Sequence, residues 1–431
     1  MPTTQLQVVP HLTTATQGPI LNIEKTLLEQ QAAIESWFRQ QWQKTPAPFY
    51  GSIDLRNSGF KLAPVDTNLF PAGFNNLNKA FAPLSIHALQ ATMERICPDA
   101  KGILIIPENH TRNQFYLKSL AALEGLFIQA GYQVRLGSLL QKDQPQDIQL
   151  DNGQTLRLHP IQRKNDEIYV DGIKSCAILL NNDLSGGRPA ILENIQQKII
   201  PPLALGWSQR LKSDHFSIYQ QVAAEFSKLV SLDPWLFDPL FSNCSKINFK
   251  TREGEDCLAE NAAKLLGQIR EKYKEHNIDE EPYVVIKADA GTYGMGIMVV
   301  KDPSEIYDLN RKQRNKMSFS KEKQKISQVI LQEGVPTYES WGDDEDVAEP
   351  VIYTIDHFVV GGFYRVHTQR GPTENLNAPG MEFQPLAFAE ACNAPDQSRS
   401  PDAEPNRFYA FGVIARLALL AAAREIKNAQ Q

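Results

Sequence analysis

The sequence has no excess of positive charge and no long apolar run. It holds 44 Lys and Arg against 50 Asp and Glu in 431 residues, a formal net charge of −6. Without a positive field that could hold a phosphate backbone, nucleic acid is not expected as a partner. No stretch approaches the roughly eighteen apolar residues of a membrane-spanning helix, so a membrane is not expected as a partner either.

Cysteine is scarce, and its positions follow no metal or disulfide pattern. The cysteines are odd in number and widely scattered, without any C-x-x-C pair: Cys97, Cys176, Cys244, Cys257 and Cys392. We therefore expect reduced thiols, as in a cytoplasmic protein. The first residues also lack the basic start and apolar core of a signal peptide, and we expect a cytoplasmic location.

What is present is the composition of a folded globular chain, with 42% hydrophobic and 22% charged residues. At roughly 100–200 residues per domain, the length predicts two or three domains. Helical spacing of apolar residues predicts a helix over 22–42, and a Gly-, Pro- and Asn-rich segment over 49–78 predicts a long functional loop. A strand over 102–107, a helix over 115–130 and a strand over 176–183 follow. Their alternation favours an α/β layer.

The segment 283–301, YVVIKADAGTYGMGIMVVK, predicts a β-hairpin with a glycine-rich tip. Gly291, Gly294 and Gly296 permit the positive φ values and the close backbone approach that a loop over phosphates needs. Lys287, near the end of the first strand, could place a positive charge at a nucleotide phosphate. The spacing matches neither the dinucleotide fingerprint nor the Walker A loop, and the glycines could equally serve the turn alone.

Two later segments add features of a nucleotide site. An apolar strand that begins at 328 stops at Gln332-Glu333-Gly334, where backbone groups and Glu333 could bond an adenine amine or a ribose. A strand pair follows, turns at Asp356-His357, ends on Arg365 and leads into an Asn-rich loop.

In this order of elements, residues 280–393 resemble the ATP-grasp superfamily. The resemblance implies a set of residues that holds the phosphates of ATP, an adenine hinge, and two side chains that reach the transferred phosphoryl group. These are, in turn, Lys287 and the loop 289–296 with Ala290, Gly291, Gly294 and Gly296; Glu333; and Arg365 with Asn375. Catalysis is assigned to Lys287 and Arg365, which neutralise phosphoryl charge.

Nearly the whole chain is similar to the small bacterial family of ATP-grasp-type glutamate–cysteine ligases. The phrases that carry the resemblance are FYGSIDLRNSGFKLAPVDTNLFPAGFNN, IPENHTRNQFY, LLNNDLSGG, PPLALGWSQRLKSDHF, IKADAGTYGMGIMVV and DHFVVGGFYRVHTQRGPTENLNAPGM. It implies an α/β fold with a substrate-binding region over 1–250 and an ATP-grasp-like region over 251–431. It also implies that ATP phosphorylates the glutamate γ-carboxylate and that the cysteine amine attacks the acyl phosphate. That reaction is the first step of glutathione synthesis, with small molecules as partners and ATP and Mg²⁺ as cofactors.

The metal ligands depart from the pattern of the superfamily, which ends in an E-x-N strand. Magnesium prefers carboxylate and amide oxygens, and two pairs offer them. Glu390 and Asn393 lie in FAEACN, which reads E-x-x-N, while Glu374 and Asn377 lie in the earlier loop. Both pairs remain candidates, and each could also be ordinary polar loop residues.

Recognition of two amino acids calls for Arg at carboxylates and for acidic or amide oxygens at ammonium groups. Polar side chains gather in the N-terminal loops and just after the strands at 102–107 and 176–180, where α/β sheets bind ligands. The candidates are Arg56, Asn57, Lys61, Asp66 and Asn68; Glu108, His110, Arg112 and Asn113; and Asn181 and Asp183. Each could instead hydrogen-bond a loop backbone, as Asn and Asp often do.

Two other functions stay open at this point. The ATP motifs do not read the acceptor, so the chain could ligate a different amino acid pair, or it could be a nucleotide-binding regulator without ligase activity. If it is a ligase, Lys287→Ala and Arg365→Ala are expected to abolish ligation with little loss of fold. The sequence does not indicate an oligomeric state.

Overall fold

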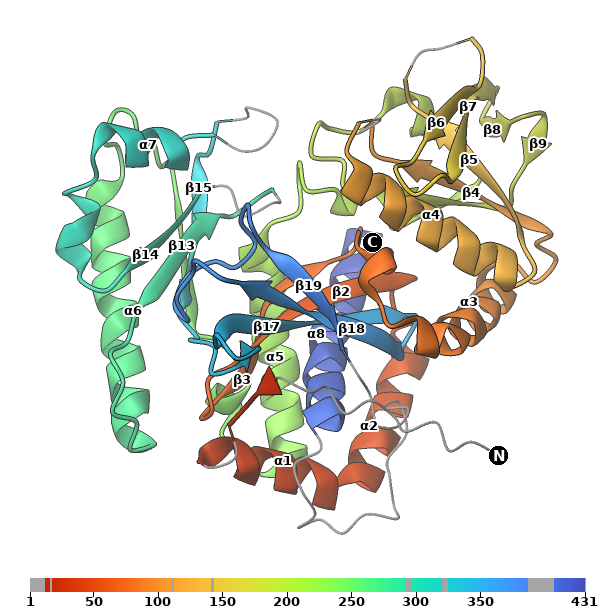
Figure 1. Cartoon of the computed structure of the whole chain (residues 1–431). Helices are drawn as coiled ribbons and strands as arrows, with labels where there is room; N and C mark the ends of the chain where they lie inside the picture. The colour runs from red at the N-terminus through yellow and green to blue at the C-terminus, as the bar shows by residue number, and fades with distance from the viewer. Residues whose placement is uncertain are drawn as a thin grey trace.

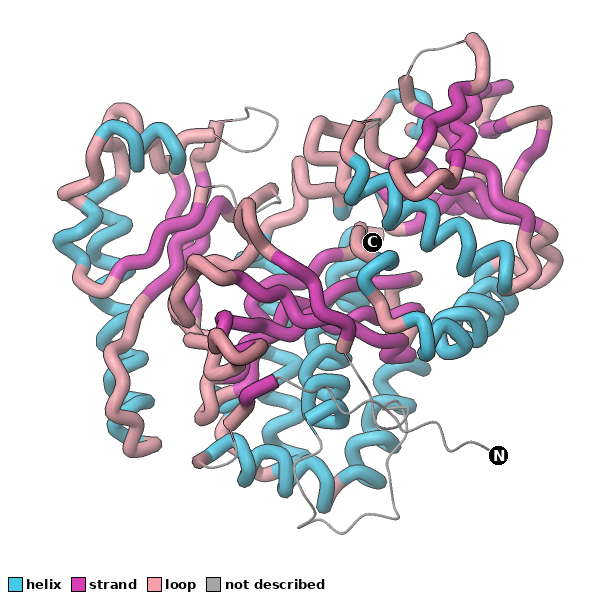
Figure 2. Tube along the Cα trace, viewed as in Figure 1, coloured by secondary structure: helices cyan, strands magenta, loops and turns pink. Residues whose placement is uncertain are grey.

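The structure is a computed structural model that describes residues 12–15, 18–109, 112–140, 143–291, 296–319, 325–386 and 407–430. Its described strands form three sheets, of seven, eight and four strands, with helices packed on them (Figure 1; Figure 2). The mixed α/β fold that the sequence predicts is therefore confirmed. Within these ranges no helix combines the length and hydropathy that a membrane crossing would need.

The central sheet is antiparallel and takes strands from both ends of the chain. In order it contains β1 (Leu12–Thr13), β16 (Ser340–Trp341), β17 (Asp346–Ile355), β18 (Phe358–His367) and β19 (Glu382–Pro385), while β2 (Tyr50–Asn57) joins β17 to β3 (Leu62–Asn68). Two registers matter for the site, because Glu349 pairs with Arg365 and Asp54 pairs with Asp66. Each pair places charged side chains side by side across neighbouring strands.

Helices cover one side of this sheet (Figure 1). They are α1 (Pro19–Glu29), α2 (Gln31–Lys44), α5 (Lys212–Val230) and α8 (Arg407–Ala429). The α8 segment is apolar on nearly every side, which predicts a buried helix, and its residues from Ala410 to Ala423 are buried against α5, β2 and β3. The helix expected over 22–42 is divided at Gln30 into α1 and α2.

The second sheet has parallel strands at its middle. Its order is β11 (Lys198–Ile200), β10 (Ala177–Asn181), β4 (Gly102–Pro107), β5 (Gln133–Ser138), β7 (Thr155–Lys164), β8 (Glu167–Val170) and β9 (Ile173–Lys174), with β6 (Gln146–Gln149) beside β7. The helices α3 (Ala82–Ile96) and α4 (Gln114–Gln129) share its apolar core. Strands β4 and β10 are parallel neighbours, so the loops that follow them leave the same edge.

The third sheet is antiparallel and carries the predicted hairpin. Its order is β12 (Phe241–Ser245), β15 (Gln328–Glu333), β13 (Val284–Ala288) and β14 (Ile297–Val300). The long helix α6 (Glu255–Glu275) packs on it and the short helix α7 (Arg311–Met317) lies nearby. The apolar face of α6 is buried, and Gly254 is its N-cap residue. Short 3-10 helices lie at Phe74–Asn76, Lys79–Phe81, Ala190–Leu192, Leu203–Leu205, Pro234–Leu236 and Pro303–Ile306.

The boundary at residue 250 does not coincide with a boundary between sheets. Strands β2 and β3 precede it, yet they belong to the central sheet with β17, which follows it. Helices α5 and α8, one from each side of it, also pack together. The division into 1–250 and 251–431 stays a proposal about the order of functional segments along the sequence.

One cysteine expectation is corrected. Cys97 and Cys176 are joined in a disulfide, with their Cα atoms 6.4 Å apart, although 79 residues separate them. Cys97 ends α3 and Cys176 immediately precedes β10. Because α3 and β10 share one layered core, the fold brings together two cysteines whose sequence spacing shows no relation.

Candidate functional site

A single cavity of about 640 Å³ collects side chains from all three sheets. The third sheet contributes the hairpin strands β13 and β14, the central sheet contributes β2, β3, β17 and β18, and the loops after β4 and β10 contribute polar groups. Predicted site residues from both the N-terminal and the C-terminal part of the sequence therefore face one space.

Lys287 lies on β13 and points into this cavity. Its ammonium donates hydrogen bonds to the carbonyl of Val65 at 2.8 Å and to the Gln332 side-chain oxygen at 2.5 Å. Burial lowers the pKa of Lys287 to about 8, against the opposing effect of Asp66. The side chain is thus held between β3 and β15 with a charge that an anionic ligand would stabilise.

The glycine-rich hairpin is confirmed, since β13 and β14 pair with Lys287 opposite Ile297. Ala290 and Gly291 line the cavity, and Gly291 has a φ of 106° that favours glycine. At Gly296, φ is 65° and a Cβ atom would lie 2.8 Å from the Ile326 side chain. Gly294 lies outside the described residues.

Asp289, which the sequence reasoning missed, fixes the start of this loop. Its buried carboxylate accepts hydrogen bonds from the Ser213 backbone N–H at 2.8 Å and from the Ser213 hydroxyl at 2.6 Å. Its carbonyl accepts from the Lys212 N–H at 2.8 Å. An acidic side chain at a helix N-terminus is favourable, so α5 holds the loop beside Lys287.

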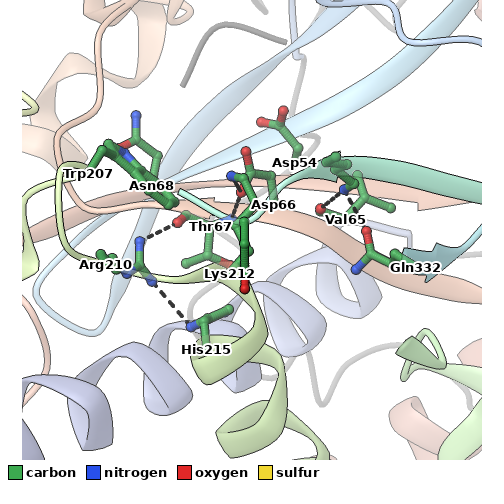
Figure 3. Close-up of polar contacts among 12 residues, drawn as sticks. Asp54, Val65, Asp66, Thr67, Asn68, Trp207, Arg210, Lys212, His215 and Gln332 are labelled. Atoms are coloured by element: carbon green, nitrogen blue, oxygen red, sulfur yellow. Dashed lines mark hydrogen bonds and ion pairs between the residues drawn. The ribbon is translucent and has the colours of Figure 1, made fainter. Parts of the chain in front are cut away.

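Lys212, which is not among the predicted site residues, is a second cation at the cavity. Its side chain is only 7% exposed, and its ammonium lies 2.7 Å from Asp66 and 4.1 Å from the centre of the Trp207 ring (Figure 3). Burial opposes ionisation of Asp66, but Lys212 and Lys287 together lower its pKa to about 2. This part of the cavity lining therefore has the Asp66 carboxylate between the Lys212 and Lys287 ammonium groups.

Arg365 stands in a buried ionic network on the central sheet. Its guanidinium contacts Glu349 at 2.5 Å and Asp54 at 2.9 Å, and Arg56 contacts the other oxygen of Glu349 at 2.7 Å. Burial alone would raise the pKa of Glu349, but the two arginines lower it. Burial raises the pKa of Asp54 despite Arg365, with Glu349 and Asp66 adding to the rise.

The Asn-rich loop is tied to this network through its backbone. Arg56 donates to the carbonyls of Pro372 at 2.8 Å and Glu374 at 2.6 Å. Glu374, Asn375 and Asn377 line the cavity, and the side chains of Asn375 and Glu374 also brace the loop. The Glu374 carboxylate accepts from Arg370 at 2.6 Å. The rival pair Glu390 and Asn393 lies outside the described residues.

Three predicted contacts need correction. Glu333 borders the cavity, but its carboxylate is buried against the Lys61 ammonium at 2.8 Å and the Trp235 indole N–H at 3.0 Å, so it is not placed to bond a ribose. Lys61 is fully buried in that pair and does not line the cavity. Asn57 is also fully buried outside the lining, where its side-chain oxygen accepts from Gly59.

The loops after β4 and β10 meet at the far end of the cavity, as their parallel strands predict. Glu108, Asn113, Asn181 and Asp183 all line it. Tyr116, which sequence reasoning missed, joins them: its hydroxyl donates to the Asn181 carbonyl at 2.8 Å and accepts from the Glu108 N–H at 2.8 Å.

The remaining predicted residues divide between lining and surface. Asp66 and Asn68 line the cavity, and Asn68 also accepts from the Phe70 N–H at 2.9 Å, which is the backbone contact expected of a turn residue. Arg112 is exposed and is not part of the lining. His110 is not among the described residues.

Two buried donors at the cavity have no protein acceptor in the described part of the chain. They are Nε2 of Gln332 and Nε of Arg365. A buried donor without a partner is costly, and the oxygens of a triphosphate are strong acceptors. The lining cations Lys287, Lys212 and Arg365, together with these donors, fit a nucleotide phosphate.

No cage made only of protein ligands marks a metal in the described lining. The described residues hold one close group of three metal-type ligands, Asp233, Glu275 and His276, and Lys272 already donates to both of its carboxylates. That group does not line the cavity. Mg²⁺ commonly uses one or two protein carboxylates together with substrate phosphates. Asp54 and Glu374, which line the cavity, could provide the carboxylates.

Comparison with known proteins gives both a family and a close structural relative. Residues 24–426 match the family model of glutamate-cysteine ligase. The chain is similar to a crystal structure from Methylobacillus flagellatus KT, provisionally assigned as a gamma-glutamylcysteine synthetase, with 57% identity, a TM-score of 0.89, and coverage of 97% of this chain and 99% of that one. The chain also matches D-alanyl-alanine synthetase A from Vibrio cholerae O1 biovar eltor str. N16961, over 74% of this chain and 81% of that one. This likeness is weak, with 10% identity and a TM-score of 0.33. No curated protein matches the chain.

Proposed function

The chain belongs to the glutamate-cysteine ligase family, and we propose that its cavity performs the ligation through an acyl phosphate made from ATP. The family places the enzyme at the formation of γ-glutamylcysteine in glutathione synthesis. The observation that carries the mechanism is the single cavity, in which Lys287, Lys212 and Arg365 face the polar loops after β4 and β10. A nucleotide and two amino acids can meet there.

Activation is needed because a carboxylate is a poor acyl donor to an amine. ATP phosphorylates the glutamate γ-carboxylate, and the cysteine amine then attacks the acyl carbon and releases phosphate. Phosphoryl transfer depends on positioning and on neutralised charge more than on a protein nucleophile. The buried cations of the cavity supply that neutralisation in a region where water screens little.

The nucleotide lies between the β13–β14 hairpin and the end of β15, in an ATP-grasp-like arrangement. Tyr283, Val285 and Ile297 offer an apolar surface for the adenine ring. Gln332 and Lys287 then lie on the phosphate side, where the unpartnered amide N–H of Gln332 finds an acceptor. The Glu333 carboxylate accepts from Lys61 and Trp235 and takes no part in binding the nucleotide.

Mg²⁺ would be held by oxygens of the central sheet and the Asn-rich loop. Glu374 and Asn377 line the cavity, and Asp54 does so from β2. The ion would add positive charge at the phosphates. The raised pKa of Asp54, caused by burial, is consistent with a carboxylate that gains from a nearby cation.

The two amino acids occupy the end formed by the loops after β4 and β10. Glu108 and Asp183 offer carboxylates for ammonium groups, and Asn113 and Asn181 offer amides for either end of an amino acid. Tyr116 holds this group together by its bonds to both loops. We place the reaction in the cytoplasm, where ATP and free amino acids are abundant.

The test measures ADP release and product mass from purified protein given ATP, Mg²⁺, glutamate and cysteine, with each amino acid omitted in turn. We expect ADP only when both are present, together with the dipeptide. Transfer of oxygen from labelled γ-carboxylate to phosphate would reveal the acyl phosphate. Phosphate without the label would reject that intermediate.

Lys287→Met supplies the variant, and Lys301→Met is its matched control. Lys301 follows the neighbouring strand β14, where it is exposed and pairs with Glu281. We expect the Lys287 variant to lose turnover by a factor of 10² or more, as removal of a charge-stabilising group typically does. Equal losses in both variants would remove Lys287 from the chemistry.

A further inference from the structure

Two free cysteines meet on the third sheet, outside the lining of the cavity. Cys244 lies on β12 and Cys257 lies in the first turn of α6. Their Sγ atoms are 3.4 Å apart, which is direct contact between sulfur atoms. None of the roles assigned to the cavity uses either residue.

The two thiols differ in access. Cys257 is exposed, whereas Cys244 is 3% exposed and lies behind it. Burial raises the pKa of the Cys244 thiol to about 12, and the neighbouring Cys257 adds to the rise. A reagent in solution therefore meets Cys257 first, and Cys244 reacts only with a partner that is already beside it.

The surrounding strand and helix hold the two cysteines in position. Cys244 pairs with Val329 of β15 in the antiparallel ladder, and α6 is anchored by the buried Leu258 next to Cys257. The Asn261 amide donates to the Cys257 carbonyl at 2.9 Å and lies 3.3 Å from the Cys244 sulfur. A disulfide needs a sulfur separation of about 2.05 Å, so the two Sγ atoms, now 3.4 Å apart, must move closer before the bond forms.

We propose that Cys244 and Cys257 form a dithiol site that exchanges with small-molecule disulfides such as cystine. The Cys257 thiolate attacks one cystine sulfur, forms a mixed disulfide and releases one cysteine thiolate. The Cys244 thiol loses its proton to solvent, and its sulfur attacks the Cys257 sulfur and releases the second cysteine. Two protein thiols are oxidised to one disulfide, and one cystine is reduced to two cysteines.

The geometry predicts which species accumulates. Because Cys244 is already in contact with Cys257, closure needs no second molecule, and the 244–257 disulfide rather than the mixed disulfide should be the end product in the wild-type protein. In Cys244→Ser the second step is blocked, so the cysteine adduct should remain on Cys257. In Cys257→Ser the buried Cys244 should resist exchange and carry no adduct.

The experiment incubates the full-length protein with cystine, quenches with acid, and maps the products by mass spectrometry after alkylation of free thiols and digestion without reduction. We expect a 244–257 cross-linked peptide in the wild type and an adduct on Cys257 in Cys244→Ser. A thiol reductant should reverse both. Circular dichroism checks that each serine variant folds; if one does not, the wild-type map alone decides.

The proposal fails if the wild type keeps a cysteine adduct on Cys257 while Cys244 stays alkylatable after unfolding. It fails equally if neither thiol reacts, or if the cross-link joins either residue to another cysteine. Ligase activity does not enter this readout, so the result is independent of the proposed function.

Discussion

Lys287 gives the first test at the scale of a single residue, because the cavity itself opposes its charge. Burial lowers its pKa to about 8; Asp66 and Asp54 raise it, while Lys212 and Arg56 lower it further. The ammonium is therefore present below pH 8 and lost as the pH rises through that value. We expect ATP to bind more weakly at pH 9.5 than at pH 7, measured by calorimetry across that range.

The control for this prediction is Lys287→Arg. A guanidinium stays charged throughout the range, so the variant should bind ATP with a flatter pH profile. An unchanged profile would assign the titration to another group.

We revise the expectation that Arg365→Ala causes little loss of fold, because that expectation assumed an exposed side chain. Its guanidinium contacts Asp54 and Glu349, so Arg365→Ala takes this cation from the partly buried Asp54 and leaves the buried Glu349 paired with Arg56. Removing one partner of a buried pair costs roughly 3–5 kcal/mol. We expect a loss of stability of that order in urea unfolding, in addition to lost ligation. A wild-type unfolding midpoint in the alanine variant would contradict this.

Residue types revealed part of the site in advance and concealed the rest. Lys287 and the glycines stood out because the hairpin pattern gives them positions. Lys212 and Asp289 did not, since a basic residue at a helix start and an acid in a loop look like solvated groups until the fold brings β3 and the loop after β13 to the start of α5. Lys61 shows the opposite error, because a lysine in a polar loop gave no sign of its buried pair with Glu333.

At the scale of elements, the contact between the residue after β15, Gly334, and the Tyr283 ring before β13 allows a test of the proposed nucleotide site. A Cβ atom at Gly334 would overlap the Tyr283 ring, which lines the cavity. We expect Gly334→Ala to move that ring and to weaken ATP binding several-fold, by roughly 1 kcal/mol or more. Stability and nucleotide affinity, measured on the same sample, would check this.

Gly267→Ala is the matched change in α6. Its added methyl group meets no atom within 4 Å, and alanine favours a helix over glycine by roughly 1 kcal/mol. We expect equal or higher stability and unchanged ATP affinity. If both variants lowered ATP affinity alike, the Tyr283 contact would not be its cause.

Periodic elements were predictable and their partners were not. The apolar face of α6 and the hairpin of β13 and β14 follow from spacing over short stretches. The pairing of β2 with β17 joins segments almost 300 residues apart, and nothing in either strand specifies the other. For that reason the contact of Asp54 with Arg365, on which the proposed phosphoryl site depends, lay beyond sequence reasoning.

At the scale of the whole molecule, α8, near the end of the sequence, forms buried ion pairs with residues of the 1–250 region. Arg416 of this helix forms a buried pair with Glu35 of α2, and Glu425 forms one with Arg210, just before α5. Arg210 also donates to the Thr67 carbonyl of β3 at 2.7 Å (Figure 3). These contacts tie the last helix to the strand that carries Asp66, so cavity geometry depends on residues far along the chain.

Acid should therefore weaken the molecule through Glu425. Burial opposes its ionisation, but Arg210 and His215 lower its pKa to about 2 from an unfolded value of 4.5. A lowered carboxyl pKa contributes stability that is present above the unfolded value and is lost as the pH falls through the folded one. The shift corresponds to about 3 kcal/mol, so urea unfolding of the wild type should lose stability from pH 5 toward pH 2. Glu425→Gln should be less stable at pH 7 and should flatten that slope.

Glu225→Gln is the control. It removes a surface pair with Arg424 of the same helix, and because the Glu225 carboxylate is 45% exposed, it should change stability by only about 0–1 kcal/mol and keep the slope. If the Glu425 variant retained the wild-type slope, the acid sensitivity would reside elsewhere in the fold.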